Sequence, residues 1–258
     1  DFFLYDRTTG TTALVSHRVG SLVEGANGAP PAIGDGLGSI SADGNWVMFA
    51  SEGTDLVAGQ VDTNASSDLF LFEVATGQVT LVNHLVGSAV TTAGSFTWIG
   101  QLSADGRFVA FECGGPGLFP GQDPGAPFRG VLLHDRVTGQ RRLVSHSHLG
   151  PAVPVSSGSF GAMSADGRYL AWSTSATDVV AGLVDTNQRA DIYVFDRTRD
   201  QSTLVSHRAG APLVAANGES LPQGISDDGR TVAFLSKATD IAAGVADGNA
   251  ESDAFIAR

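Results

Sequence analysis

The chain has 258 residues, of which 42% are hydrophobic and 33 are glycine, a composition that fits many strands joined by tight turns better than a helical protein. Fifteen Lys and Arg residues against 27 Asp and Glu give a net charge of −12, which argues against nucleic-acid binding and is compatible with cation capture. Cys113 is the only cysteine, so the chain forms no internal disulfide, and no apolar run reaches the roughly 18 residues that span a bilayer.

The predicted elements begin at the first residue. DFFLYD at 1–6 is strand-like, which we interpret as a processed or truncated N-terminus, and TALVSH at 12–17 is a second strand. From residue 38 onward a longer pattern starts, in which GSIS leads through an Asp-Gly turn to NWVMFAS, and a loop then leads to DLFLFE and VTLVNH. This pattern predicts four antiparallel strands.

The same pattern returns along the chain. Its turn aspartates, spaced 62, 61 and 62 residues apart, are Asp43, Asp105, Asp166 and Asp228. Each belongs to SADG or SDDG, and an Asp-Gly pair between apolar runs predicts a type I′ hairpin turn, in which glycine supplies a positive φ. The third strand occurs five times. The fourth strand occurs four times, as TALVSH, VTLVNH, RRLVSH and STLVSH.

Four antiparallel strands repeated at this period predict an all-β fold, a β-propeller with blades of about 62 residues. We expect one domain over 1–258, made of units at about 1–38 (a partial blade), 39–85, 98–147, 160–208 and 222–258. The second and third strands are apolar at nearly every position, which predicts burial of both faces between stacked blades. No stretch has sustained helical periodicity, so we expect negligible helix.

The hairpin S-x-DG-(R)-x-aromatic/aliphatic-A-F, followed by D-(I/L)-(Y/F)-(V/L)-(F/Y)-D, resembles the repeat of bacterial TolB-like, WD-type β-propellers over essentially the whole chain. Because such propellers serve as scaffolds, binding modules and appendages of enzymes, the resemblance implies the fold and leaves the function open. The five third strands leave two arrangements open: a four-bladed ring with one strand left over, or part of a larger propeller or assembly.

Acidic loops precede three of the third strands, as in VDTNASSD, VDTNQRAD and ADGNAESD. Oxygen ligands at offsets 0, 2 and 6, with a further Asp seven residues upstream, are spaced as the early ligands of calcium loops are. The predicted Ca²⁺ ligands are Asp55, Asp62, Asn64 and Asp68; Asp178, Asp185, Asn187 and Asp191; and Asp240, Asp247, Asn249 and Asp253. The alternative is turn capping, because Asp and Asn side chains bond their own backbone.

Four histidines recur at the end of the fourth strand, each after Ser or Asn: His17, His84, His146 and His207. Adjacent strand residues point to opposite faces, so a Ser-His neighbour pair cannot act as nucleophile and base. We expect these histidines to be packed or solvated between blades. Cys113 is expected to be a buried, small apolar residue.

The second unit departs from its sisters at 112–130, ECGGPGLFPGQDPGAPFRG. This loop brings aromatic side chains together with those of the segment before it, and exposed aromatics favour binding. The candidate partner-binding residues are Phe96, Trp98, Phe119 and Phe128, and the alternative is that they pack over the blade edges.

Catalytic sites break repeat symmetry, whereas nearly every polar feature here is repeated. The sequence therefore favours a secreted, non-enzymatic propeller, extracellular or periplasmic, that binds another protein or a glycan and orders its loops with calcium. The alternative is a hydrolase or lyase with its active site at the mouth of the central channel; no catalytic residue is assigned.

Overall fold

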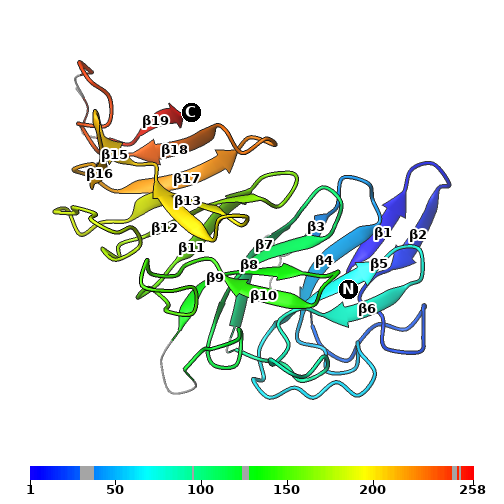
Figure 1. Ribbon diagram of the computed structural model, residues 1–258. Coiled ribbons are helices and arrows are strands. Elements are labelled where there is room, and N and C mark those ends of the chain that lie inside the picture. The colour runs from blue at the N-terminus through cyan, green and yellow to red at the C-terminus, as the bar shows by residue number, and fades with distance from the viewer. Residues whose placement is uncertain (30–37, 95, 124–127, 246–248, 250) are drawn as a thin grey trace.

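The computed structural model describes residues 1–29, 38–94, 96–123, 128–245, 249 and 251–258. Every regular element in these residues is a β-strand, as the sequence predicts, and the strands form six antiparallel sheets (Figure 1). Within the same residues there is no helix of the length and hydropathy that a membrane span requires.

Three of the sheets are four-stranded blades in which each strand pairs with the next along the chain. The first blade consists of β3 (Gly38–Ile40), β4 (Trp46–Ser51), β5 (Asp68–Glu73) and β6 (Gln78–Leu81). The second consists of β7 (Phe96–Leu102), β8 (Phe108–Gly114), β9 (Arg129–Asp135) and β10 (Gln140–Leu143). The third consists of β11 (Ser159–Met163), β12 (Tyr169–Thr174), β13 (Asp191–Asp196) and β14 (Gln201–Leu204).

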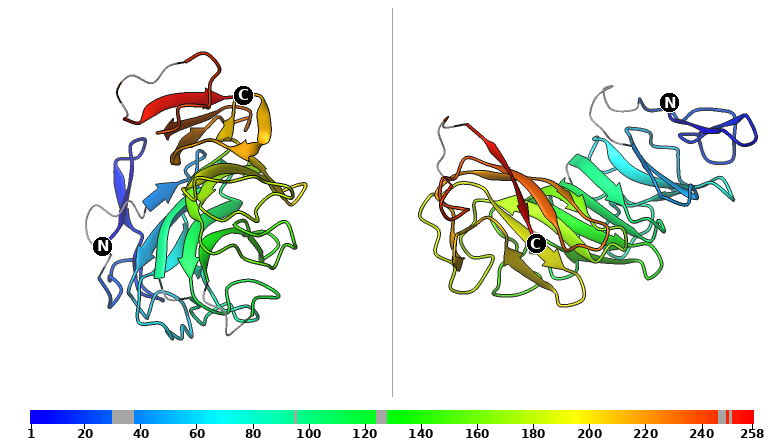
Figure 2. Two further views of the ribbon diagram at one scale, coloured as in Figure 1. Left: turned by 90° about the vertical axis from the view of Figure 1, so that its left-hand side faces the viewer. Right: turned by 90° about the horizontal axis from the view of Figure 1, so that it is seen from above.

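Incomplete sheets lie at the two ends of this row. The N-terminal hairpin has only the third and fourth strands of the repeat, β1 (Phe3–Asp6) and β2 (Thr11–Leu14). The C-terminal sheet has only the first three strands, β17 (Ser220–Ile225), β18 (Val232–Ser236) and β19 (Asp253–Ala257). Figures 1 and 2 place these two sheets at opposite ends of a curved, open array, so the described residues do not close into a ring.

The loop after each fourth strand folds back at the recurring histidine. Isolated antiparallel bridges join His17 to Gly25, His84 to Thr92 and His146 to Pro154. At the fourth position the fold-back becomes a hairpin that the sequence pattern does not predict, β15 (His207–Arg208) with β16 (Ala211–Ala215).

Both faces of the inner strands are buried because neighbouring blades stack on them, as predicted. In β8, Val109 and Phe111 pack against the first blade, in a cluster with Met48 and Leu71. The alternate residues of the same strand, such as Phe108, face the third blade. Each blade therefore has a backward face toward the preceding sheet and a forward face toward the next one.

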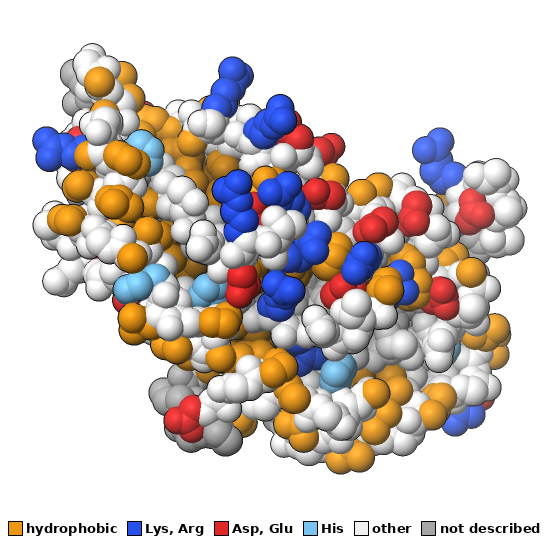
Figure 3. All heavy atoms as spheres, in the orientation of Figure 1, with side chains coloured by type: hydrophobic (Ala, Val, Ile, Leu, Met, Phe, Trp, Pro, Cys, Tyr) orange, Lys and Arg blue, Asp and Glu red, His pale blue; other side chains and the backbone are white. Residues whose placement is uncertain are grey.

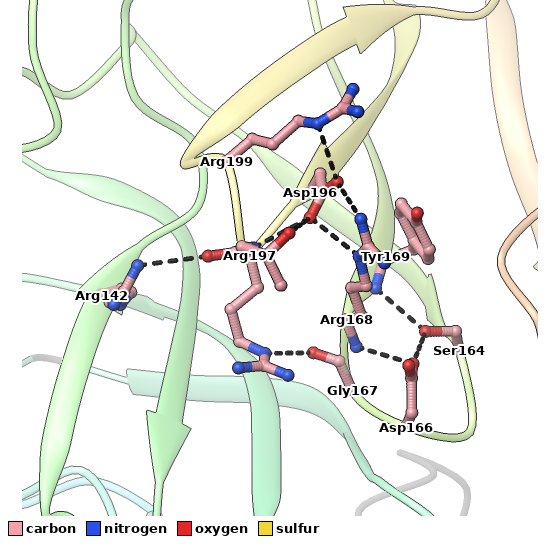
Figure 4. Close-up of polar contacts among 10 residues, drawn as sticks. Arg142, Ser164, Asp166, Gly167, Arg168, Tyr169, Asp196, Arg197 and Arg199 are labelled. Carbon is pink, nitrogen blue, oxygen red and sulfur yellow. Dashed lines mark hydrogen bonds and ion pairs between the residues drawn. The ribbon is translucent and has the colours of Figure 1, made fainter.

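The Asp-Gly turn is not the predicted type I′ turn. Type I′ requires a positive φ at both central residues, but in each turn only the glycine has one, as at Gly167 with φ +66°. The Gly167 N–H donates to the Ser164 carbonyl, so glycine occupies the fourth position of the turn. The Ser164 hydroxyl donates to Asp166 and accepts from the Tyr169 N–H, which explains the recurrence of serine in the motif (Figure 4).

The turn glycine also lies against the preceding blade. A Cβ added at Gly167 would lie 2.6 Å from the Phe108 ring, and Gly106 and Gly229 meet Trp46 and Tyr169 even more closely. On its other side the Phe108 ring carries the guanidinium of Arg197, 3.9 Å from the ring centroid, and Arg197 Nε donates to the Gly167 carbonyl. Aromatic ring, glycine turn and arginine thus fix the offset between consecutive blades.

Candidate functional site

The Ser or Asn before each recurring histidine ties two strands of one blade together. The Ser145 hydroxyl accepts from the Val131 N–H at 3.0 Å, and the Ser206 hydroxyl accepts from the Ile192 N–H at 2.9 Å. Ser16 and Asn83 accept in the same way from Phe2 and Leu69. These side chains complete the start of the third strand and have a structural role.

Three of the four histidines contact a ring of the next sheet, as predicted. His17 meets Phe72 edge to face at 5.9 Å between ring centroids, and His146 meets Phe195 at 5.7 Å. In each of the four histidines, Nδ1 lies within hydrogen-bonding distance of the carbonyl oxygen of the next residue, at 2.9 Å in His146. Because a carbonyl oxygen only accepts, Nδ1 carries the proton and donates.

The junction between the first and second blades departs from this pattern. His84 meets His134 instead of a phenylalanine, with ring centroids 5.9 Å apart. Beside them lies Arg141, buried on β10 at a position that β6 and β14 fill with Val79 and Ser202. The Arg141 guanidinium donates to the carbonyls of His84 and Leu118, each at 2.8 Å, and to that of Val82.

The electrostatics of this cluster follow from burial. Burial lowers the pKa of Arg141 to about 10, so Arg141 is charged at neutral pH. Burial and the Arg141 charge together lower the pKa of His134 to about 3, so His134 is neutral. Three carbonyls receive charge-assisted hydrogen bonds from Arg141, which join the end of the first blade to a loop of the second.

The acidic loop before β5 is held by its own hydrogen bonds. Asp62 Oδ1 accepts from the Asn64 and Ala65 N–H groups, at 2.9 and 3.0 Å. Asn64 accepts from the Ser66 N–H and donates through Nδ2 to Asp68, which also accepts from Asn83 Nδ2 at 2.7 Å. Asn64 therefore presents a donor, not an oxygen ligand, to Asp68.

The loop before β13 is built in the same way. Asp185 accepts from the Asn187 and Gln188 N–H groups, Asn187 accepts from the Arg189 N–H, and Asp191 accepts from the Ser206 hydroxyl. The upstream Asp55 and Asp240 accept from the N–H groups of Asn27 and Asn217, both at 2.9 Å. Asp247 lies outside the described residues.

These contacts favour turn capping for the predicted ligands. Across the described parts of the chain, no three His, Cys, Asp or Glu side chains are grouped so that they could hold a metal ion. Calcium binding by these loops stays a prediction to be tested by experiment.

Two of these aspartates, Asp68 and Asp191, are buried, and only one or two side chains donate hydrogen bonds to each. Burial raises the pKa of Asp191 to about 7 against the opposing hydrogen bond from Ser206, and nearby Asp185 raises it further. Burial raises the pKa of Asp68 to about 6 against the hydrogen bonds from Asn83 and Asn64. Ionisation of either carboxyl therefore opposes folding.

Replacing Asp191 with asparagine is expected to raise the free energy of unfolding by about 1–3 kcal/mol near pH 8. With a raised pKa, folded Asp191 binds more protons than the unfolded chain between about pH 4 and 7, so wild-type stability falls as pH rises through that range. The variant should lose the part of this slope that Asp191 contributes and keep the part from Asp68, whereas the exposed Asp227→Asn should keep the whole slope, as measured by urea unfolding at several pH values.

The same unfolding curves, repeated with a chelator and with added calcium, test the metal prediction. The capped-turn arrangement predicts the same Asp191→Asn gain in both buffers. A calcium-dependent stabilisation of the wild type that Asp191→Asn removes would instead place calcium in this loop.

Two of the predicted partner-binding aromatics lie in the core. Phe119 and Phe128 are buried and pack against each other, with ring centroids 5.2 Å apart. This corrects the expectation of an exposed patch in favour of the packed alternative, because residues 115–122 fold like their counterparts in the first blade. Gln122 accepts from the Leu118 N–H and donates to the Gly115 carbonyl, as Gln60 does with Leu56 and Gly53.

The other two aromatics, Phe96 and Trp98, lie in β7, and their side chains are outside the described part of the structure. Cys113 is buried in the same core, as predicted.

Arginine–carboxylate pairs follow the strand ends on the face shown in Figure 3, where positive and negative side chains alternate over the middle of the array. Arg168 forms a two-pronged ion pair with Asp196 (Figure 4), and Arg107 pairs in the same way with Asp135. Arg107 lowers the pKa of Asp135 to about 2. Burial alone would raise the pKa of Asp196, but hydrogen bonds from Arg168 and Thr198 hold it well below its ordinary value.

No protein-family model matches the chain, and no curated protein matches it. Among solved structures, it is similar to TolB from Acinetobacter baumannii, with 16% identity and a TM-score of 0.43 over 92% of this chain and 46% of that chain. It is similar to the putative TolB from Agrobacterium tumefaciens, with 18% identity and a TM-score of 0.41 over 78% of this chain and 53% of that one. A structure from a study of two prolyl endopeptidases gives 15% identity and a TM-score of 0.49 over 91% of this chain and 28% of that chain. The chain thus spans about half, or less, of the length of these proteins.

Proposed function

We propose that the chain is a non-enzymatic scaffold that assembles through the two uncovered faces of its blade array. The observation that carries the proposal is the exposure of side chains whose counterparts inside the array are buried. Secretion, and binding of a further protein to the assembled array, belong to the same proposal.

The head face is the backward face of the N-terminal hairpin, formed by Phe3 and Tyr5. These side chains are 65% and 60% exposed. Phe70 and Phe72 hold the same strand positions in the first blade and are 0% and 3% exposed, because the N-terminal hairpin covers them. The head face is therefore the backward half of a blade junction that has no forward half against it in the described structure.

The tail face is the forward face of the C-terminal sheet, formed by Leu221, Leu235 and Ile256. Strand pairing places these side chains on the face opposite Val232 and Phe234, which pack on the third blade. Ile256 is 68% exposed, whereas its counterparts Leu71 and Leu133 are 1% and 2% exposed. The tail face is thus the forward half of a junction.

The internal junctions define what fits these faces. At the junction between the second and third blades, the aliphatic Leu133 of the forward face meets the aromatic Phe195 of the backward face. The tail face is likewise aliphatic and the head face likewise aromatic. In a solution of this chain a second copy supplies the missing half, so we propose head-to-tail association, a heterologous contact that extends from copy to copy.

Sedimentation at increasing concentration tests the association. The wild type should form progressively larger species, whereas Phe3→Glu with Tyr5→Glu, or Leu221→Glu with Ile256→Glu, should each stay monomeric. All four positions are exposed, so the blades should still fold, and unchanged melting curves would verify this. A wild type that stays monomeric at every concentration would overturn the proposal.

A further inference from the structure

A groove on the outer rim, between the second and third blades, carries an inference that does not rest on the end faces. It has a volume of about 390 Å³ and is lined by the loop after β10, the loop that contains Val179, and the turn between β13 and β14. That volume lies within the roughly 300–1,000 Å³ of small-ligand sites.

A buried histidine nitrogen lines this groove without a partner. His146 is 6% exposed, its Nδ1 lies 2.9 Å from the Ser147 carbonyl, and its Nε2 has no hydrogen-bond partner. At the first junction the equivalent Nε2, that of His17, lies 2.9 Å from the Gly77 carbonyl. With Nδ1 donating to the Ser147 carbonyl, Nε2 is the remaining nitrogen of a ring that lines the groove, and it can accept a hydrogen bond.

A strained residue adds a carboxylate to the same groove. Asp200 ends the turn between β13 and β14 in the left-handed region, with φ +55°. The equivalent turns have glycine in that conformation at Gly10, Gly77 and Gly139. Strain of this kind is typical of functional positions, because glycine would remove it at no cost to the turn.

We propose that this groove binds a carbohydrate. His146 Nε2 and the Asp200 carboxylate both accept hydrogen bonds, so they require ligand O–H or N–H donors. Arg142 lies 3.6 Å from Asp200 and opposes a second cation there, which favours a neutral hydroxyl-rich ligand over an ammonium group. Val179, Val180 and Pro151 supply an apolar wall for the C–H face of a sugar ring.

The test follows the ring nitrogens of His146 by ¹H–¹⁵N NMR during titration with methyl β-D-glucopyranoside, methyl α-D-mannopyranoside, methyl β-D-galactopyranoside and N-acetylglucosamine. At least one sugar should shift the Nε2 signal saturably, as expected when an acceptor gains a donor. Propylammonium chloride is the parallel probe for a cationic ligand.

The variants separate binding from folding. Asp200→Asn tolerates the left-handed conformation and should weaken sugar binding at least about tenfold, since a hydrogen bond to a charged group is lost. Asp200→Gly should also weaken sugar binding, while its melting temperature is no lower than that of the wild type. Gln78 in the first blade is the counterpart of the groove residue Gln201, so Gln78→Ala serves as a control and should bind sugar normally. No saturable shift with any sugar, a shift with propylammonium alone, or full affinity in Asp200→Asn would each overturn the inference.

Discussion

Replacing Gly167 with alanine is expected to lower the free energy of unfolding by about 3 kcal/mol or more. A left-handed backbone costs a residue with a Cβ about 1–2 kcal/mol, and the new Cβ would also lie 2.6 Å from the Phe108 ring of the preceding blade. That ring is buried, so it moves only at the further cost of about 1–3 kcal/mol typical of overpacked cores.

Gly44 provides the matched control for this experiment. It holds the same turn position with φ +73°, and no atom lies within 4 Å of a Cβ added there. Gly44→Ala should therefore show only the backbone cost, and the difference between the two variants in urea unfolding measures the contact between blades. Equal losses would mean that the turn glycine has no role in stacking.

Replacing Arg141 with leucine is expected to lower the free energy of unfolding by about 3 kcal/mol, because buried carbonyls of two blades lose their charged donor. Arg142, its neighbour on β10, has a half-exposed side chain, and Arg142→Leu should cost less than about 0.5 kcal/mol. Chemical unfolding of both variants makes the comparison. If the two losses are alike, the hydrogen bonds of Arg141 do not hold the junction together.

Much of the fold was predictable from local signals. Apolar runs such as DIYVFD at 191–196 are buried on both faces, and the SADG turns occur where the sequence places them. The turn geometry was predicted wrongly, because Asp-Gly also fits a turn with glycine at its fourth position, which the serine hydroxyl of the motif stabilises.

The loop at 112–130 shows the limit of reading composition without contacts. Its Pro and Gly residues suggested an exposed loop, but Gln122 repeats the hydrogen bonds of Gln60, and Phe119 enters the core. The alignment of Gln122 with Gln60 was the one sequence feature that could have indicated that the two loops fold alike.

The polar sites were harder to predict because they depend on contacts between blades. Repetition drew attention to the acidic loops, in which Asp62 and Asp185 accept hydrogen bonds from the backbone of their own turns. The residues that break the repeat gave a weaker signal: Asp200 replaces a glycine and His134 an aromatic residue of the sister blades, whereas Arg141 stands at a position that varies. Only the three-dimensional junction shows that Arg141 reaches three carbonyls, or that Asp200 shares a groove with an unpaired His146 nitrogen.

The two uncovered faces are the central feature of the account, and mixing two blocked variants tests their complementarity most directly. Phe3→Glu with Tyr5→Glu leaves only the tail face, and Leu221→Glu with Ile256→Glu leaves only the head face. Head-to-tail docking predicts that each variant alone sediments as a monomer and that an equimolar mixture forms a 1:1 heterodimer and nothing larger. A mixture that stays monomeric, or either variant dimerising alone, would contradict the account.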